Sequence, residues 1–172
     1  GRDLFAVQHH HAHAVSLIAE HQCIGEPVLA VAYDGTGFGT DGTIWGGELL
    51  AITDPASFTR VGHLKPFALP GGDEAARQPS RIALDLLHRA GIGWDADLAP
   101  VVAIGPAGMK VLAQQIPRGL RCVTTSSMGR LFDAVSSLLG VCQRVSYEGQ
   151  AAVELEHLAR GGRPRGAEVD FG

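Results

Sequence analysis

Apolar positions recur with two different periods along the chain, and these periods predict both helices and strands. Residues 8–21 carry apolar side chains at helical spacing, directly after a short apolar run at 4–7, so we predict a strand end followed by a helix. Residues 28–33 form a continuous apolar run, which favours a central strand covered on both faces. Residues 43–52 predict a second strand. The opening part of the chain is therefore expected to combine one helix with several strands.

The remainder of the chain is predicted to be mostly helical. Prolines and glycines at 54–72 indicate an irregular connection, which a helix over 73–89 follows. The further elements expected are, in order, a short helix after Pro106, a brief strand at 122–124, helices over 128–141 and 149–160, and a loop or linker over 161–166. Either Ser126 or Ser127 is expected to cap the helix over 128–141.

Composition narrows the class of protein. The 172 residues are 45% apolar, which is enough to bury a sizeable core. Lys and Arg number 14 against 18 Asp and Glu, so the chain lacks the basic footprint typical of proteins that bind nucleic acid or membrane surfaces. No apolar run approaches the roughly 20 residues of a membrane span, and the three cysteines form no Cys-x-x-Cys pair. We therefore expect a cytoplasmic protein with reduced thiols and with neither nucleic acid nor a membrane as partner.

A histidine-rich stretch carries the first candidate chemistry. In Val-Gln-His-His-His-Ala-His at 7–13, only His9 and His13 stand four apart, which places two imidazoles on one helical face within reach of one metal ion. The other histidines are expected to point elsewhere. Neutral imidazole suits Fe(II) or Zn(II). A chance pair on an exposed helix is the alternative, whereas a zinc protease is disfavoured because the Glu of His-Glu-x-x-His is missing.

A glycine-rich turn follows the first apolar strand. Asp34 stands where the strand ends, and glycines follow at positions 35, 37, 39 and 42. Their bare backbone N–H groups can hold a phosphate or a carbonyl group, while Asp34 can ligate a metal. Because Asp-Gly is also the commonest tight-turn signal, an ordinary hairpin is the slightly favoured alternative. The turn is not a P-loop, since no Gly-Lys-Ser/Thr follows it.

Two helices near the C-terminal end carry isolated polar residues. Asp133 lies among apolar neighbours, where it either pairs with Arg130 or binds a ligand. Gly149 stands at the start of the last predicted helix, with Glu154 in its first turns. That position suits an approaching nucleotide or an ordinary cap. The sequence pattern alone does not decide between ion pairing and ligand binding for Asp133, or between a nucleotide site and a helix cap for Gly149.

Five phrases resemble the HypF family of hydrogenase maturation carbamoyltransferases, specifically its C-terminal catalytic region. They are the histidine stretch at 7–13, Asp-Gly-Thr-Gly-Phe-Gly-Thr-Asp-Gly-Thr-Ile-Trp-Gly-Gly-Glu at 34–48, His-Leu-Lys-Pro-Phe-Ala-Leu-Pro-Gly-Gly-Asp at 63–73, Thr-Ser-Ser-Met-Gly-Arg-Leu-Phe-Asp-Ala-Val at 125–135, and Ser-Tyr-Glu-Gly-Gln at 146–150. The tryptophan-containing phrase and the Pro-Gly-Gly-Asp phrase separate the chain from the more distant O-carbamoyltransferases and tRNA threonylcarbamoyl transferases.

The resemblance implies an α/β fold that is part of an actin/Hsp70-like (ASKHA), two-lobed architecture with a mixed sheet and flanking helices. It divides the chain, as a partial catalytic region over 1–172, into a metal-binding helix and glycine loop (7–53), an irregular connection with helices (54–120) and nucleotide-side helices (121–160). It also implies that the other domains of such enzymes, and the last metal-binding Asp of the family, lie outside these residues. We therefore expect the chain alone to have little or no transferase activity.

The same resemblance implies a site and a reaction. The residues are His9, His13 and Asp34 for one divalent metal, iron or zinc, and Gly35, Thr36, Gly37, Asp133, Gly149 and Glu154 for ATP or carbamoyl-adenylate. Asp34 is also the implied catalytic residue. The carbamoyl group would pass to the C-terminal cysteine of a HypE-type acceptor in nickel–iron hydrogenase maturation, with the metal as a Lewis acid. Alternatives are a small-molecule O-carbamoyltransferase, a non-catalytic module that docks the acceptor, and a metallohydrolase, which is disfavoured because no general base lies near the pair.

Overall fold

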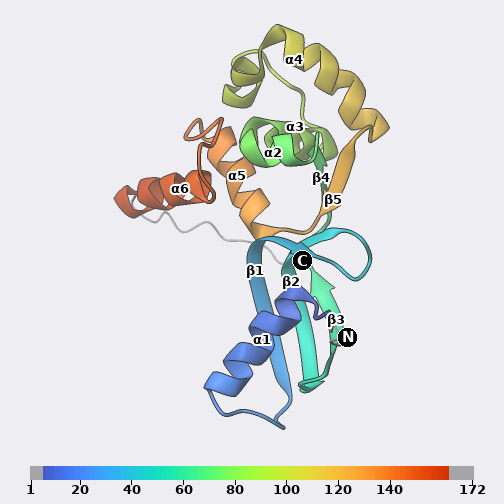
Figure 1. Ribbon diagram of the computed structural model, residues 1–172. Coiled ribbons are helices and arrows are strands. Elements are labelled where there is room, and N and C mark those ends of the chain that lie inside the picture. The colour runs from blue at the N-terminus through green and yellow to red at the C-terminus, as the bar shows by residue number, and fades with distance from the viewer. Residues whose placement is uncertain (1–5, 163–172) are drawn as a thin grey trace.

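The computed structural model describes residues 6–162, which form a curled mixed sheet with helices at both of its ends (Figure 1). The elements are, in chain order, α1 His9–Glu20, β1 Val28–Phe38, β2 Ile44–Asp54, β3 Ser57–His63, β4 Phe67–Pro70, α2 Asp73–Arg77, α3 Pro79–Arg89, α4 Ala99–Arg118, β5 Cys122–Thr125, α5 Met128–Leu138 and α6 Gln150–Gly161. Figure 1 shows α1 beside β1, β2 and β3 at one end, and the other helices around β4 and β5 at the other. The predicted α/β class is confirmed.

The sheet is built on a long hairpin of β1 and β2. The two strands pair antiparallel, and their register shifts between Tyr33 and Gly37, so that a bulge contains Asp34. The hairpin closes where the N–H of Gly39 donates to the carbonyl of Thr43 at 2.9 Å. β2 also pairs antiparallel with β3 and parallel with β5, and β5 pairs antiparallel with β4. The hairpin interpretation of the glycine-rich turn is therefore confirmed.

The irregular connection predicted over 54–72 is wrong, because this segment contains β3 and β4. Side chains of β3 alternate between partly buried and exposed positions, and all four residues of β4 are buried. Pro66 precedes β4 and Pro70 ends it, so neither proline interrupts the interior of a strand. The prolines that suggested a loop in fact stand at strand ends.

The prediction that the strand at 28–33 is covered on both faces is also wrong. Among the described residues β1 pairs only with β2, and Leu29, Val31 and Tyr33 are 57–67% exposed. The alternate residues Val28 and Ala30 pack on the core instead. A strand with apolar side chains on both faces is therefore not necessarily packed on both faces.

The helix predicted over 73–89 is two helices. Pro79 stands at the start of α3 and disfavours a helical Gln78, whose backbone has φ −130° and ψ 81°. The short helix expected after Pro106 is the second part of α4, which is kinked at Gly105 (φ 69°, ψ 168°). The other predicted helices are confirmed within a few residues, and Ser127 caps α5.

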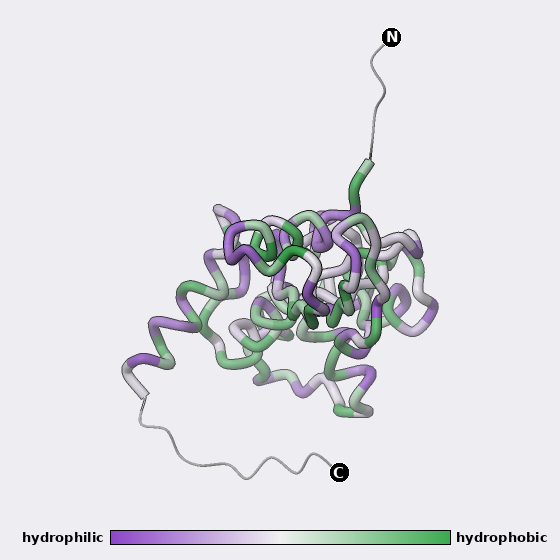
Figure 2. The backbone as a smooth tube through the Cα atoms, turned by 90° about the horizontal axis from the view of Figure 1, so that it is seen from below, coloured by the Kyte–Doolittle hydropathy of each residue, from purple (hydrophilic) through white to green (hydrophobic). Residues whose placement is uncertain are grey.

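Three apolar clusters hold the elements together. One packs Ala14 and Ile18 of α1 on Trp45, Leu50 and Ile52 of β2. The others lie between α3, α5 and β4 and between α3 and α4. Full burial of a side chain such as Leu50 stabilises by about 1.5–3 kcal/mol, so the first cluster fixes α1 on the hairpin. In Figure 2, hydrophobic and hydrophilic residues are mixed along the helices, as expected for helices that pack only one face on the core.

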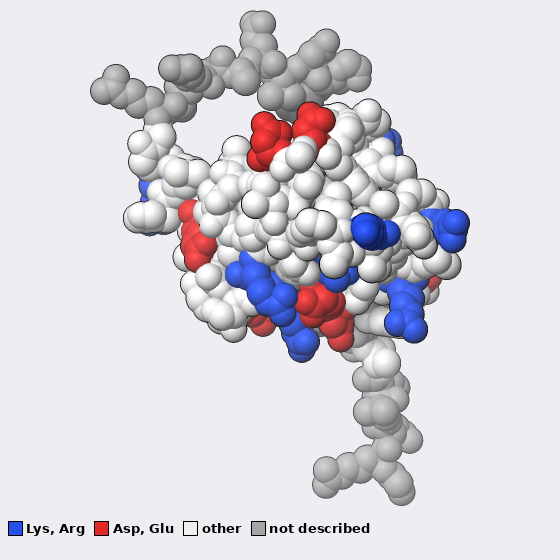
Figure 3. Space-filling view, turned by 90° about the horizontal axis from the view of Figure 1, so that it is seen from above, with Lys and Arg blue, Asp and Glu red and all other residues white. Residues whose placement is uncertain are grey.

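The surface carries charges of both signs. On the face seen in Figure 3, Lys and Arg are interspersed with Asp and Glu. Within residues 6–162, no helix has the length and apolar character needed to cross a bilayer. All three cysteines are free, and only Cys142 is fully buried. Half of the strand end predicted over 4–7 and most of the linker predicted over 161–166 lie outside the described residues, and residues 6 and 7 are not in a strand.

Candidate metal and nucleotide site

The start of α1 is fixed by the side chain of Gln8. Its Oε1 accepts a hydrogen bond from the backbone N–H of His11 at 2.8 Å, which caps the helix. Its Nε2 donates to the carbonyl of Phe38 at 3.2 Å and lies 3.1 Å from Nδ1 of His10. One amide therefore joins the beginning of α1 to the end of β1.

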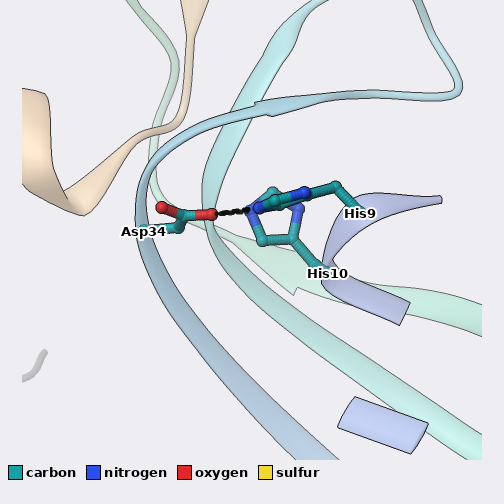
Figure 4. Close-up of side chains that lie close together, drawn as sticks. All are labelled: His9, His10 and Asp34. Atoms are coloured by element: carbon teal, nitrogen blue, oxygen red, sulfur yellow. Dashed lines mark hydrogen bonds and ion pairs between the residues drawn. The ribbon is translucent and has the colours of Figure 1, made fainter. Parts of the chain in front are cut away.

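Metal-ligating groups converge where α1 crosses the bulge of β1 (Figure 4). Nε2 of His9 lies 2.8 Å from Oδ2 of Asp34 and 3.2 Å from Nε2 of His13. The structure thus places His9 beside both Asp34 and His13, whereas the ligand atoms that all lie within 4.8 Å of one another are those of His9, His10 and Asp34, without His13. The expectation that the other histidines point elsewhere is wrong for His10, because its Nε2 lies 3.4 Å from the same Oδ2 of Asp34.

The two contacts of His9 have lengths close to those between neighbouring ligands of one divalent cation. Tetrahedral zinc, with bonds of about 2.0–2.2 Å, holds its ligand atoms roughly 3.3 Å apart. The observed separations of 2.8 Å from His9 to Asp34 and 3.2 Å from His9 to His13 are close to that value. The side chains of His9 and Asp34 are 46% and 30% exposed, so the cluster is open on one side. Imidazole and carboxylate together accept either iron or zinc.

The protonation states suit metal binding as well. Burial raises the pKa of Asp34, but hydrogen bonds from the backbone of Gly35, from His9 and from the backbone of Thr36 outweigh it and hold the pKa below its ordinary value. Burial lowers the pKa of His10 more than the neighbouring Asp34 carboxylate raises it. The carboxylate is therefore ionised and the His10 imidazole neutral at pH 7, and both forms are compatible with a bound cation.

A single hydroxyl ties the bulge to α5. The Oγ of Ser127 lies 2.7 and 2.8 Å from the carbonyl oxygens of Asp34 and Gly35, which share its one hydroxyl proton. It accepts the backbone N–H of Arg130 at 3.1 Å, which caps α5. The position of Asp34 therefore depends on where α5 begins.

Two glycines allow the close approach of these elements. A Cβ on Gly37 would lie 2.3 Å from Cε1 of His10, and a Cβ on Gly129 of α5 would lie 2.8 Å from Cα of Gly35. Real Cβ atoms do not come so close, so a side chain at either position would displace its neighbour. Gly37 and Gly129 are therefore needed for the close packing of α1, β1 and α5.

A cavity of about 470 Å³ opens beside the bulge. Its lining includes Thr36, Arg77, Arg130, Asp133, Tyr147 and Gly149. Three of the residues predicted for the nucleotide, Thr36, Asp133 and Gly149, therefore share this cavity. Gly35, Gly37 and Glu154 do not line it, and Glu154 instead accepts a hydrogen bond from Nε2 of Gln150 at 2.8 Å.

Asp133 and Arg130 give the cavity its charged wall. Oδ2 of Asp133 lies 3.0 Å from a guanidinium nitrogen of Arg130, so the pairing left open by the sequence analysis is present. Burial raises the pKa of Asp133 to about 6, although Arg130 lowers it. Arg77 and Arg130 add positive charge that the sequence analysis did not assign to the site. The signal for Arg130 was its place within the phrase at 125–135.

Comparison with known proteins identifies the family. Residues 30–171 match the family described as carbamoyltransferase, Kae1-like domain, second subdomain. The chain belongs to the HypF carbamoyltransferase family. A carbamoyltransferase HypF homolog of Cupriavidus necator is 46% identical over 154 residues, which are 90% of this chain and 39% of that protein. The probable carbamoyltransferase HypF of Methanocaldococcus jannaschii is 38% identical over 161 residues, or 92% of this chain and 21% of that protein.

Solved HypF structures share the fold. A full-length HypF in its phosphate- and nucleotide-bound form matches with a TM-score of 0.78 and 43% identity, over 90% of this chain and 20% of that one. The HypF of T. kodakarensis matches with a TM-score of 0.79 and 34% identity, over 94% of this chain and 22% of that one. The chain thus spans between about a fifth and two fifths of the length of the HypF proteins it matches.

A buried carboxylate lies close to the site of this HypF-family chain, on the face of β2 that α1 covers. Glu48 is fully buried and accepts hydrogen bonds from Nε of Arg60 at 2.6 Å, from the hydroxyl of Ser126 and from two backbone N–H groups. Burial raises the pKa of Glu48, but these hydrogen bonds outweigh it and hold the pKa below its ordinary value. The guanidinium of Arg60 also lies 4.0 Å from the ring centroid of Trp45. This network leaves no local signal in the sequence, because its members come from β2, β3 and the segment before α5.

Proposed function

We propose that this chain is part of a cytoplasmic enzyme that transfers a carbamoyl group from carbamoyl-adenylate, made from ATP, to the C-terminal cysteine of a HypE-type acceptor. This reaction would serve nickel–iron hydrogenase maturation. Membership of the HypF family supports the proposal. The observation that carries it is that Nε2 of His9 lies close to both Asp34 and His13, near a cavity of about 470 Å³. We further propose that the chain forms part of an actin/Hsp70-like, two-lobed fold.

In this proposal the metal site consists of His9, His13 and Asp34. A divalent cation held there, iron or zinc, would supply Lewis-acid polarisation of the carbamoyl carbonyl. The two imidazoles offer neutral nitrogen ligands, and the negative charge of the ionised Asp34 carboxylate would partly neutralise the cation. The glycine-rich backbone that follows Asp34 would face the acyl phosphate, and the N–H of Gly35, which donates to Oδ1 of Asp34 at 2.6 Å, also holds the carboxylate in place.

The transfer itself is a displacement at the carbamoyl carbon. The acceptor sulfur forms a bond to this carbon, the bond from the carbon to the phosphate oxygen breaks, and AMP leaves with the electron pair. The thiol proton passes to solvent. In this step, the residues of this chain hold the carbamoyl group in line with the thiolate.

The cavity beside the bulge is the proposed nucleotide site. Its volume of about 470 Å³ falls within the range of small-molecule sites. Arg77 and Arg130 suit the phosphate, since guanidinium groups bind phosphate in two-pronged fashion. Asp133 is available to accept hydrogen bonds from ribose hydroxyls. A HypF relative solved in a nucleotide-bound form supports a nucleotide in this family.

To test the proposal, this chain is expressed together with the remaining domains of its enzyme. Histidine variants of that complete enzyme are then compared with the wild type. His9→Ala and His13→Ala should lose bound metal and slow carbamoyl transfer by at least about 100-fold, because several kcal/mol of transition-state stabilisation are removed. His21→Ala, an exposed histidine at the end of the same helix, is the matched control and should retain both. Metal content is read by elemental analysis, and transfer by labelled carbamoyl on the acceptor.

Three outcomes would overturn parts of the proposal. Transfer at the control rate by the His9 and His13 variants would remove the metal from the mechanism. Transfer to a small-molecule hydroxyl but not to the cysteine would replace the acceptor. Turnover of carbamoyl-adenylate by the isolated chain, at the rate of the whole enzyme, would show that no other domain is needed.

A further inference from the structure

The proposed metal site leaves one buried neighbour unexplained. The residue is His10, which is 1% exposed, and its Nε2 has no hydrogen-bond partner although it lies 3.4 Å from Oδ2 of Asp34. Its ring is stacked on Trp45, with ring centroids 6.4 Å apart and planes 23° apart. Leaving a buried polar atom without a partner costs about 1–3 kcal/mol. The position of His10 therefore calls for a partner at Asp34.

The hydrogen bonds of Gln8 determine which nitrogen of His10 carries the proton. The backbone N–H of His11 donates to the amide oxygen of Gln8, so the other end of that amide is its NH₂ group. This NH₂ group lies 3.1 Å from Nδ1 of His10. Because an amide NH₂ only donates, Nδ1 must accept, and a neutral imidazole then has its one proton on Nε2. The N–H group of Nε2 then lies beside Asp34, with Oδ2 at 3.4 Å and no hydrogen bond formed in this arrangement.

A protonated ring nitrogen cannot ligate a metal. His9, His10 and Asp34 offer ligand atoms within 4.8 Å of one another and could be taken for a metal-binding trio. Resting on the proposed function, we infer instead that His10 is a positioning residue, which donates from Nε2 to Asp34 and does not bind the metal. Outer partners of this kind orient a ligating carboxylate.

The role of His10 follows from what happens to His9. Nε2 of His9 lies 2.8 Å from Oδ2 of Asp34, as in a hydrogen bond. A histidine that ligates through Nε2 can no longer donate from that atom, so metal binding by His9 removes this contact. His10 is then the remaining imidazole donor to Asp34, and it holds the carboxylate in the direction of the cation.

Zinc affinity, measured on the complete polypeptide against a competing chelator, tests the role of His10. His10→Leu removes the donor and should weaken binding by about 10–100-fold. His10→Gln keeps an N–H near the position of Nε2 and should restore most of the affinity. His11→Leu is the matched control, since His11 is also buried and contacts Phe58, and it should bind zinc like the wild type.

Two patterns of affinity contradict the inference. If His10→Gln binds zinc as weakly as His10→Leu, His10 is a ligand. If His11→Leu weakens binding as much as His10→Leu, the effect is structural and has no connection with Asp34. Thermal unfolding of the metal-free variants accompanies each titration, so that loss of affinity is separated from loss of fold.

The position of the proton gives a readout that needs no metal. Nitrogen NMR of the metal-free protein with labelled histidine should show His10 protonated at Nε2 only, identified as the signal absent from His10→Gln. A proton on Nδ1 would overturn the inference. If the wild type shows the Nε2 proton but binds no metal, the proposed function fails while the tautomer assignment stands.

Discussion

Replacing Gly37 by alanine would place a methyl group against the ring of His10. The added Cβ would lie 2.3 Å from Cε1, 2.8 Å from Nε2 and 3.0 Å from Nδ1. Non-bonded carbon atoms pack at about 3.5–4.0 Å, so the overlap at Cε1 exceeds about 1 Å. The ring has little room to retreat, because Trp45 is stacked on it and Gln8 holds Nδ1. His10 must therefore move away from its place beside Asp34.

The cost of this displacement follows from studies of overpacked cores. An added methyl group in a well-packed site destabilises by about 1–3 kcal/mol. In a chain that carries His10→Ala the ring is gone, and Gly37→Ala should then cost less than about 0.5 kcal/mol. The two substitutions are thus coupled by about 0.5–3 kcal/mol.

Urea unfolding followed by tryptophan fluorescence measures this coupling in the wild type, the two single variants and the double variant. Gly93→Ala is the control, because its Cβ would meet only Oδ1 of Asp95 at 3.8 Å. Additive costs, equal in both backgrounds within about 0.5 kcal/mol, would refute the packing of His10 against Gly37. Gly37→Ala should also weaken zinc binding, as His10→Leu does.

Three further predictions concern residues around the site. Ser127→Ala should lower the free energy of unfolding in urea by about 1–2 kcal/mol, since it removes the α5 cap; a change near zero would contradict the capping role. Because burial raises the pKa of Asp133 to about 6, the folded state holds that proton more tightly, and stability should fall by on the order of 2–3 kcal/mol as pH rises from about 4 to 6. Asp133→Asn should remove this decrease in the free energy of unfolding. If the variant and the wild type show the same pH dependence, the raised pKa of Asp133 is not its cause. Glu48→Gln weakens the buried pair with Arg60 and should cost on the order of 3 kcal/mol at pH 7. The pKa of Glu48 lies below its ordinary value, so this cost should shrink as pH falls through the lowered pKa, and a constant difference from pH 7 to pH 3 would disprove the assignment.

The sequence predicts correctly those elements in which apolar side chains recur with a single period, either helical or strand-like. α1, β2 and α5 carry such a period and lie where the sequence places them. β3 was missed although its side chains alternate between two faces, because nearby prolines and glycines suggested a loop. The exposure of Leu29 and Val31 was unpredictable from an apolar run, since packing partners are not encoded in the strand itself.

The site was predictable only where its members are close in sequence or belong to a familiar phrase. The spacing of His9 and His13 placed both on one face of α1, and the glycine turn singled out Asp34. His10 was missed because its partner comes from β1, whereas helical spacing describes only contacts within one helix. The amide of Gln8, which bridges α1 and β1, leaves no periodic signal at all.

The double contact of the Ser127 hydroxyl has a consequence for communication within the molecule. Because the same oxygen anchors the carbonyls at the bulge and the first turn of α5, a ligand that favours this placement of the helix also favours this placement of Asp34. Thermodynamic linkage makes the effect reciprocal, with the same free energy in both directions. Occupancy of the nucleotide cavity and of the cation site would then be correlated without any large movement of the chain.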